Sequence, residues 1–330
     1  MSQYVLSINP GVAGMGSHDP SAVLFEDGAV VFGVEEERFT RQKHATGTFP
    51  KQAIKACLDA EGIALRDVES VVVPWEPSNF PRTIPRVMQR ASALPQPPLR
   101  RAKYVGWRVK SDVNSWLSGR RAVERKLRDV GTPVPPVETR EHHASHAASA
   151  FYPTEFDDAL VVTLDARGEY DATVVWKGDE SGVHRLRTYD YTNSLGYFYG
   201  AVTQFLGFYP NNGEGKVMGL APYGSPNEDI ESILRSVIET GVDYDVTALS
   251  QNFKPATERL EDLFDRSRKR SPDDFTQWEK DLAFAAQSIT EEIVTDIVRT
   301  YCERLGTGNV GLAGGVALNC KMNKRVMERD

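Results

Sequence analysis

The feature that most constrains the fold is a pattern of strands and turns that occurs twice along the chain. The first copy, residues 4–34, runs from an apolar segment through a glycine-rich turn into two further apolar segments. The second copy, residues 159–190, has the same order, and Asp165 follows its first apolar segment where the first copy has Asn9. Such a duplication predicts an α/β protein with two like-folded halves that face each other across a cleft.

Each copy also carries a tight turn between its last two apolar segments, and Glu26-Asp27-Gly28 is a strong hairpin signal. Two strand–turn–strand units that bracket a cleft are the layout of actin-like and sugar-kinase ATPases, in which the turns hold phosphates. The later segment GLAGGVALN (311–319) suits a third turn against the nucleotide, because paired glycines allow close backbone approach. A plain tight turn is the alternative there.

These patterns predict two domains. Residues 1–150 form the first actin-like half, with a helical basic insertion at about 81–136, and residues 151–330 form the second. The second half contains an amphipathic helix at 281–305 and a strand at 309–313. The chain stops soon after that strand, so we expect the second half to be incomplete and apolar surface on this helix and strand to lie uncovered.

The net charge of −7 is unevenly distributed, because residues 81–128 hold thirteen Lys or Arg and only two Asp or Glu. A basic segment that also contains Trp107 and Trp116 is compatible with contact to RNA or phosphates, although docking on an acidic neighbour is the more common role. We therefore do not expect nucleic acid as the main partner, and homo-oligomerisation stays open.

The start of the chain and the cysteines indicate a cytoplasmic protein. There is no long apolar run and no charged n-region followed by an apolar h-region, so neither a membrane helix nor a signal peptide is expected. The three cysteines are far apart and odd in number, which favours a reducing compartment without a disulfide framework.

Three of the six histidines fall in EHHASHAASAF (141–151). If this stretch is helical, His142 and His146 lie four residues apart on one face and can converge on one metal ion. Asp165, which ends a core-type strand, would supply a third ligand in a mixed N/O set suited to iron, zinc or manganese. The alternatives are capping or core histidines and a turn aspartate.

Two further residues are candidates for chemistry. His18 lies in the first glycine-rich turn beside Asp19, and its unperturbed pKa near neutrality suits a general base. Lys43, in RQKH, is placed to hold an anion. The segment NNGEGKVMGLAPYG (211–224), which contains Lys216, predicts a mobile loop able to close over a ligand. For each of these, a solvated surface role is the alternative.

Five motifs in this order closely resemble the O-carbamoyltransferase family of nodulation-factor, cephalosporin and aminoglycoside biosynthesis (the NodU/CmcH type): HDPSAVLFEDG, EEERFTRQKH, EHHASHAASAFYP, GEGKVMGLAPYG and LAGGVALNC. The resemblance covers essentially the whole chain. It implies the duplicated actin-like fold and a transferase in which carbamoyl phosphate and ATP give carbamoyl adenylate in a C-terminal YrdC-like domain. The carbamoyl group then passes to an acceptor hydroxyl in the domain represented here.

The resemblance also implies roles for particular residues. His142, His146 and Asp165 match three of four iron ligands, while His143 matches none and is left beside the site. His18 matches the suspected base and Lys43 a substrate-side lysine. The nucleotide turn is matched by Gly314, Gly315 and Asn319, and Gly168 and Lys216 are further candidates for nucleotide contact. The sequence departs from the family pattern after Asp165, where DARGEY replaces a glycine-rich DGxGE run.

The expected function is therefore transfer of a carbamoyl group to a hydroxyl of a small-molecule, natural-product or sugar acceptor, with a divalent metal. The fourth ligand and the adenylate-forming domain are expected beyond residue 330, in the same gene or in a partner chain. Two alternatives stay open: a threonylcarbamoyl transferase acting on tRNA, which the basic segment favours mildly, and a non-catalytic nucleotide-binding fragment or subunit.

Overall fold

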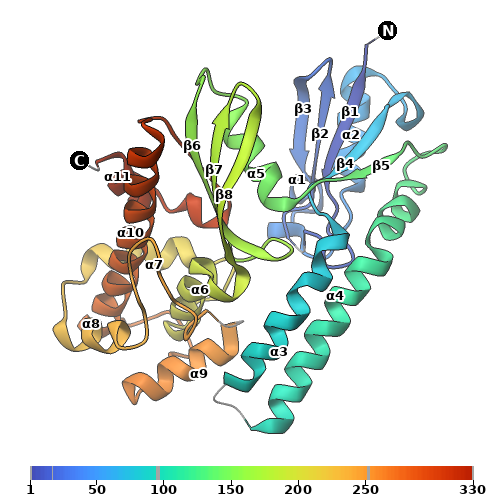
Figure 1. Ribbon diagram of the computed structural model, residues 1–330. Helices are drawn as coiled ribbons and strands as arrows, with labels where there is room; N and C mark the ends of the chain where they lie inside the picture. Colours follow the sequence, from blue (N-terminus) through green and yellow to red (C-terminus); the bar gives the residue numbers. More distant parts are fainter. Residues whose placement is uncertain (1, 17, 94–96, 251–252, 329–330) are drawn as a thin grey trace. The chain divides into compact units, whose positions relative to one another are not determined.

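The computed structural model describes residues 2–16, 18–93, 97–250 and 253–328 (Figure 1). It divides into two compact units, residues 1–145 and 146–330. The boundary falls inside helix α5 (His142–Phe151), five residues before the position at which the sequence pattern placed it.

The first unit is built on a five-stranded sheet with the order β3-β2-β1-β4-β5. Strand β1 pairs antiparallel with β2 and parallel with β4, and β4 pairs parallel with β5. The strands are β1 Tyr4–Asn9, β2 Ser21–Glu26, β3 Ala29–Glu35, β4 Ser70–Val73 and β5 Val137–Thr139. The predicted hairpin joins β2 to β3 through Asp27 and Gly28, both at positive φ, as a type I′ turn requires.

The helices of the first unit include two long ones in the basic segment. They are α1 Glu37–Thr40, α2 Lys51–Glu61, α3 Ile84–Ala93 and α4 Pro98–Leu127. Helix α2 begins where the buried carboxylate of Glu36 accepts the N–H groups of Gln52 and Ala53, and it ends at Gly62 in the left-handed conformation. Helices α3 and α4 pack side by side (Figure 1).

The second unit repeats the topology of the first. Its four-stranded sheet has the order β8-β7-β6-β9, with β6 antiparallel to β7 and parallel to β9, as β1 is to β2 and β4. The strands are β6 Ala159–Leu164, β7 Asp171–Asp179, β8 Gly182–Asp190 and β9 Val310–Ala313. The repeated order in two separate sheets confirms the duplicated actin-like α/β fold. The described residues give β5 no counterpart in the second sheet.

The helices of the second unit are α6 Leu195–Phe205, α7 Glu214–Leu220, α8 Glu228–Arg235, α9 Phe253–Phe264, α10 Gln277–Leu305 and α11 Cys320–Met327. These helices and the sheet together form the larger of the two hydrophobic cores among the described residues, and α6 and α10 contact the sheet. The prediction that α10 would expose apolar surface is wrong. Its stripe of Ile289, Ile293 and Ile297 is buried, because α6 and β6 pack against it. Strand β9 is half-buried throughout.

Within the described parts of the chain, none of the helices combines the length and apolar character needed to cross a membrane.

Candidate metal centre and neighbouring turns

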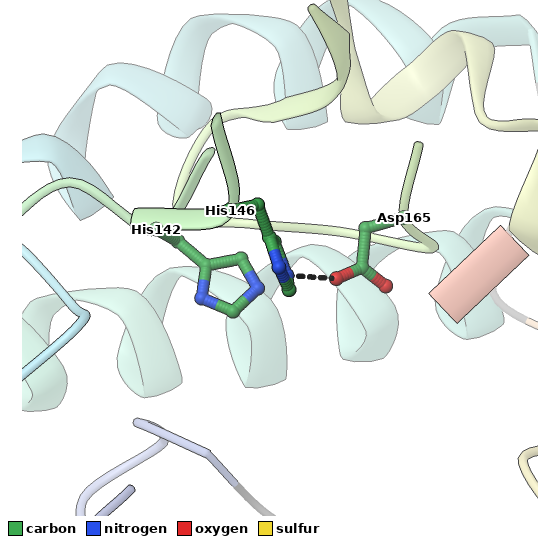
Figure 2. A group of neighbouring side chains, drawn as sticks. All are labelled: His142, His146 and Asp165. Carbon is green, nitrogen blue, oxygen red and sulfur yellow. Dashed lines mark hydrogen bonds and ion pairs between the residues drawn. The ribbon is translucent and has the colours of Figure 1, made fainter. Parts of the chain in front are cut away.

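Helix α5 places two of the predicted metal ligands on one face. His142 is its first residue and His146 lies one turn later (Figure 2). The Nδ1 atom of His142 lies 3.1 Å from the carbonyl oxygen of Pro74, and its ring stacks on Trp75 with centroids 4.0 Å apart. A carbonyl can only accept, so Nδ1 donates and the lone pair of His142 is on Nε2.

Asp165 directly follows β6, and the backbone around it is well ordered by hydrogen bonds. Its N–H donates to the carbonyl of Ala172 at 2.8 Å, and its Oδ1 accepts the N–H of Ala166 at 2.7 Å. Its other oxygen, Oδ2, lies 3.2 Å from Nε2 of His146 (Figure 2). The carboxylate is therefore aimed at the helix face that carries the histidines.

The structure brings the three predicted ligands together. One ligand atom from each of His142, His146 and Asp165 lies within 4.8 Å of the other two, and all three residues are half-buried. Ligands on one ion at about 2.0–2.2 Å lie roughly 3–4 Å apart, so small rotamer changes suffice. His143 is fully buried, and its ring lies edge-on to that of His142 with the centroids 5.9 Å apart.

The predicted nucleotide turn lies against Asp165. Gly314 has a φ of 95°, and a side chain there would meet the carbonyl of Leu164 at 2.2 Å. A Cβ on Gly315 would lie 3.2 Å from Oδ1 of Asp165. The close approach of this turn to the end of β6 therefore requires glycine at position 314, whereas a side chain at position 315 would crowd the carboxylate of Asp165.

Asn319 already has a structural role in this turn. Its Oδ1 accepts the N–H of Met322 at the start of α11, and its side-chain amide pairs with that of Gln287 at 2.9 and 3.0 Å. Gln287 also accepts the hydroxyl of Tyr199, whose phenol pKa is raised by burial. Sequence reasoning did not identify Gln287, because it is 32 residues away on α10.

The two turn residues predicted for catalysis lie in the first unit. His18 is exposed, and its Nδ1 lies 2.7 Å from Oδ2 of Asp19. Lys43 is exposed, but the next residue, His44, reaches back, and its Nδ1 lies 2.8 Å from Oδ1 of Asp19. Burial alone raises the pKa of Asp19, but the bonds from His18 and His44 outweigh it and hold that pKa below its usual range.

The segment predicted as a mobile loop, residues 211–224, is partly helical, because it contains α7. Lys216 lies on the exposed side of this helix, with Nζ 5.8 Å from the centre of the Phe208 ring. Gly168 donates its N–H to the carbonyl of Asp171 at 2.7 Å. In the departure from the family pattern, Arg167 folds back and donates to the carbonyl of Glu169.

Comparison with known proteins identifies relatives along almost the entire chain. An uncharacterized protein of Synechocystis, sll1178, is 36% identical over 324 residues, which cover 94% of this chain and 51% of the relative. The nodulation protein NolNO of Sinorhizobium fredii is 31% identical over 318 residues, covering 94% and 42% respectively. The chain thus spans about half the length of the curated relatives it matches.

Solved structures share the chain trace only distantly. Component A of the (R)-2-hydroxyglutaryl-CoA dehydratase of Acidaminococcus fermentans has a TM-score of 0.46 at 13% identity, covering 99% of this chain and 88% of that one. HypF of T. kodakarensis has a TM-score of 0.43 at 12% identity, with coverages of 99% and 44%.

The family comparison is decisive. The profile of the family described as "Carbamoyltransferase N-terminus" matches residues 11–330. This match includes every candidate ligand and turn described above, and the chain therefore belongs to the carbamoyltransferase N-terminal family.

Proposed function

We propose that this chain is the transfer half of an O-carbamoyltransferase, which moves a carbamoyl group from carbamoyl adenylate to a hydroxyl of a small-molecule acceptor. The observation that carries the proposal is the convergence of His142, His146 and Asp165 beside the Gly314-Gly315 turn, in a chain of this family. The donor is a mixed anhydride of carbamic acid and AMP, and a glycine turn that can approach its phosphate beside a metal-binding group supports this proposal.

The donor set supports iron as the metal. Two imidazoles and one carboxylate on a half-buried surface resemble the 2-His-1-carboxylate sites that bind iron(II) and leave coordination positions open. Bound there, the ion would supply Lewis-acid stabilisation to an oxygen of the donor. The contribution of the chain is to orient the ligands, through the Pro74 carbonyl behind His142 and the Ala166 N–H on Asp165.

His18 takes the role of proton acceptor in this proposal. The acceptor hydroxyl oxygen bonds to the carbamoyl carbon, the bond from that carbon to the phosphate oxygen breaks, and AMP leaves. Nε2 of His18 accepts the hydroxyl proton and later returns it to solvent. A correctly placed base of this kind contributes roughly 10²–10⁴-fold to the rate. Lys43, Lys216, Gly168 and Asn319 stay predictions as contacts to donor or acceptor.

The activation of carbamoyl phosphate belongs to polypeptide outside these 330 residues, in the same gene product or a partner chain. The coverage of the relatives supports this part of the proposal, because the chain matches only 51% and 42% of their lengths. The acceptor is proposed only by class, as an alcohol of a sugar or natural product.

The test is product formation from synthetic carbamoyl adenylate by the iron-loaded chain. Glycerol, methyl glucoside and an aminoglycoside serve as acceptors, and carbamoylated product is detected by mass spectrometry. The proposal predicts product with at least one acceptor, and a loss of about 10²-fold or more in His18→Gln. Equal product with and without the folded protein would refute it.

A further inference from the structure

A single carboxylate bridges two imidazoles in the first unit. Asp19 contacts Nδ1 of His18 through Oδ2 at 2.7 Å and Nδ1 of His44 through Oδ1 at 2.8 Å. His18 and Asp19 lie in the loop after β1, and His44 lies in the short 3-10 turn Lys43–Ala45 within the segment after α1. The backbone N–H of Asp19 also donates to the carbonyl of His44 at 2.9 Å. The two segments are therefore joined at this carboxylate.

The bridge determines which nitrogen of each ring carries the proton. An ionised carboxylate only accepts hydrogen bonds, so both rings donate from Nδ1. In the neutral ring, Nε2 then has no proton and its lone pair is available as an acceptor. An isolated imidazole in water prefers the opposite tautomer, with the proton on Nε2. The carboxylate thus selects the form of His18 that can act as a base.

A pair of His18 and Asp19 alone would hold this geometry poorly. The side chain of His18 is 54% exposed and that of Asp19 39%, and exposed ion pairs of this kind stabilise a geometry only weakly. His44 is less exposed, at 27%, and its backbone N–H donates to Oε2 of Glu37 at 2.8 Å. His44 is therefore the anchored member of the group, and it fixes one oxygen of Asp19 so that the other faces His18.

The backbone around the bridge is held in an uncommon conformation. Asp19 and His44 both have positive φ, of 53° and 63°, a backbone conformation that is strained for a residue with a side chain. The amide of Asn9 stabilises the first of these turns, because Nδ2 donates to the carbonyls of His18 and Asp19 at 3.0 Å. The chain accepts strain at both residues whose side chains meet.

We propose that Asp19 and His44 are positioning residues that hold the imidazole of His18 with Nε2 as the proton acceptor. The inference rests on the proposed function, in which His18 takes the proton of the acceptor hydroxyl. In this proposal His44 does not touch the reacting atoms and acts through Asp19. The proposal thus adds His44 to the site, although His44 lies 25 residues from Asp19 in the sequence.

The test uses two substitutions that both accept positive φ and differ in their hydrogen-bond donor. His44→Asn keeps an N–H that reaches Asp19, whereas His44→Gly removes it without backbone strain. Nitrogen-15 NMR of histidine-labelled full chain reports the tautomer of each ring, and His18→Gln assigns the signal of His18. Thermal melts establish that each variant is folded.

In the wild-type chain, at a pH where the rings are neutral, His18 is expected with its proton on Nδ1. His44→Gly should move His18 toward the Nε2–H form, raise the pKa of Asp19 and lower kcat for transfer from carbamoyl adenylate about 10- to 100-fold, with KM unchanged. His44→Asn should keep most of the Nδ1–H form of His18 and most of the wild-type kcat.

Two results would overturn the proposal: a wild-type His18 with its proton on Nε2, or a folded His44→Gly chain with unchanged His18 tautomer and kcat. The NMR arm does not need activity. The expected tautomers in a wild-type chain without transfer activity would therefore support the positioning by Asp19 and His44 and refute the proposed function instead.

Discussion

At the scale of single residues, the orientation of His142 comes from groups behind it. Its Nδ1 donates to the Pro74 carbonyl and its ring lies on Trp75, so the ring has little freedom to turn. A ligand oriented in advance loses less entropy when it binds an ion, and removal of such a ligand is correspondingly costly.

His142→Ala should therefore weaken iron(II) binding by at least about 10²-fold, because two ligands remain where three converged. Isothermal titration under anaerobic conditions measures this affinity. His184→Ala is the matched control, since His184 is exposed on β8 and bonded to Ser181. Equal affinity in the His142→Ala and His184→Ala chains would place the metal elsewhere.

A second prediction at this scale concerns Asp281 on α10. Its buried carboxylate accepts from Ser225, Asn227 and Gln277, and these bonds outweigh burial, so that its pKa lies below the ordinary value of 3.8. Because the pKa of Asp281 is higher in the unfolded chain, this carboxylate is protonated there at a higher pH than in the folded chain. The stabilisation is fully present above about pH 4 and is lost as the pH falls through the folded pKa.

Asp281→Asn should cost about 1–3 kcal/mol of unfolding free energy at neutral pH, because its new N–H₂ faces the amide donor of Asn227. Urea unfolding from pH 7 to about pH 3 should show this difference shrinking at the acid end. The exposed Asp274→Asn serves as control. A difference that stays constant or grows toward low pH would contradict the assignment.

The sequence predicted most securely the contacts that are set locally. His142 and His146 are one turn apart on α5, so helical spacing places them together. Asp165 was predicted from its place after an apolar strand, and tertiary folding closes its separation of 19 residues from His146. The bridge between Asp19 and His44 was missed, because it depends on two loops meeting across 25 residues. The sequence drew attention to Lys43, whereas the neighbouring His44 makes the contact with Asp19.

At the scale of elements, glycines act oppositely in turns and helices. Gly28 has a φ of 85° in the β2–β3 turn, and the space around its absent side chain is open. Gly106 lies on the exposed face of α4, also with open space around it. The two positions therefore differ in backbone conformation and not in packing.

Gly28→Ala should lower the unfolding free energy by roughly 1–2 kcal/mol, because an L-residue is strained at positive φ. Gly106→Ala should raise it by about 0.5–1 kcal/mol, since alanine loses less entropy in a helix. Denaturant unfolding of the two variants beside the wild type measures both. A Gly28→Ala chain as stable as the wild type would contradict the strained turn, and a less stable Gly106→Ala chain would contradict the open helical position.

Hairpins were easier to predict than the helix at 214–220. The Asp27-Gly28 turn follows from local φ preferences, whereas the glycine-rich EGKVMGL composition favours a loop. Tertiary packing overrides that preference, because Val217 is fully buried in the hydrophobic core of the second unit. The apolar stripe of α10 was predicted correctly. Its burial was not, because that depends on packing against α6 and β6, which the local sequence does not show.

At the scale of the whole molecule, the duplication is the organising feature. Each sheet has a polar residue at the carboxyl end of an interior strand. Asn9 is the last residue of β1 in the first unit, and Asp165 directly follows β6 in the second. Asn9 supports the turn that carries His18, and Asp165 faces the two histidines of α5. The same position in the repeat therefore contacts candidate site residues in both units. The cleft between the halves and the preference for a small-molecule acceptor over tRNA stay predictions.

The central claim is that the chain performs transfer and not activation, and a comparison of two donors tests it most directly. The iron-loaded chain is incubated with carbamoyl phosphate and ATP, or with synthetic carbamoyl adenylate, and AMP release is followed, with water as a slow acceptor. The account predicts accelerated AMP release from carbamoyl adenylate alone, and its loss in the folded Asp165→Asn variant. AMP release from carbamoyl phosphate and ATP, or none above background from the adenylate with a folded, iron-loaded chain, would contradict it.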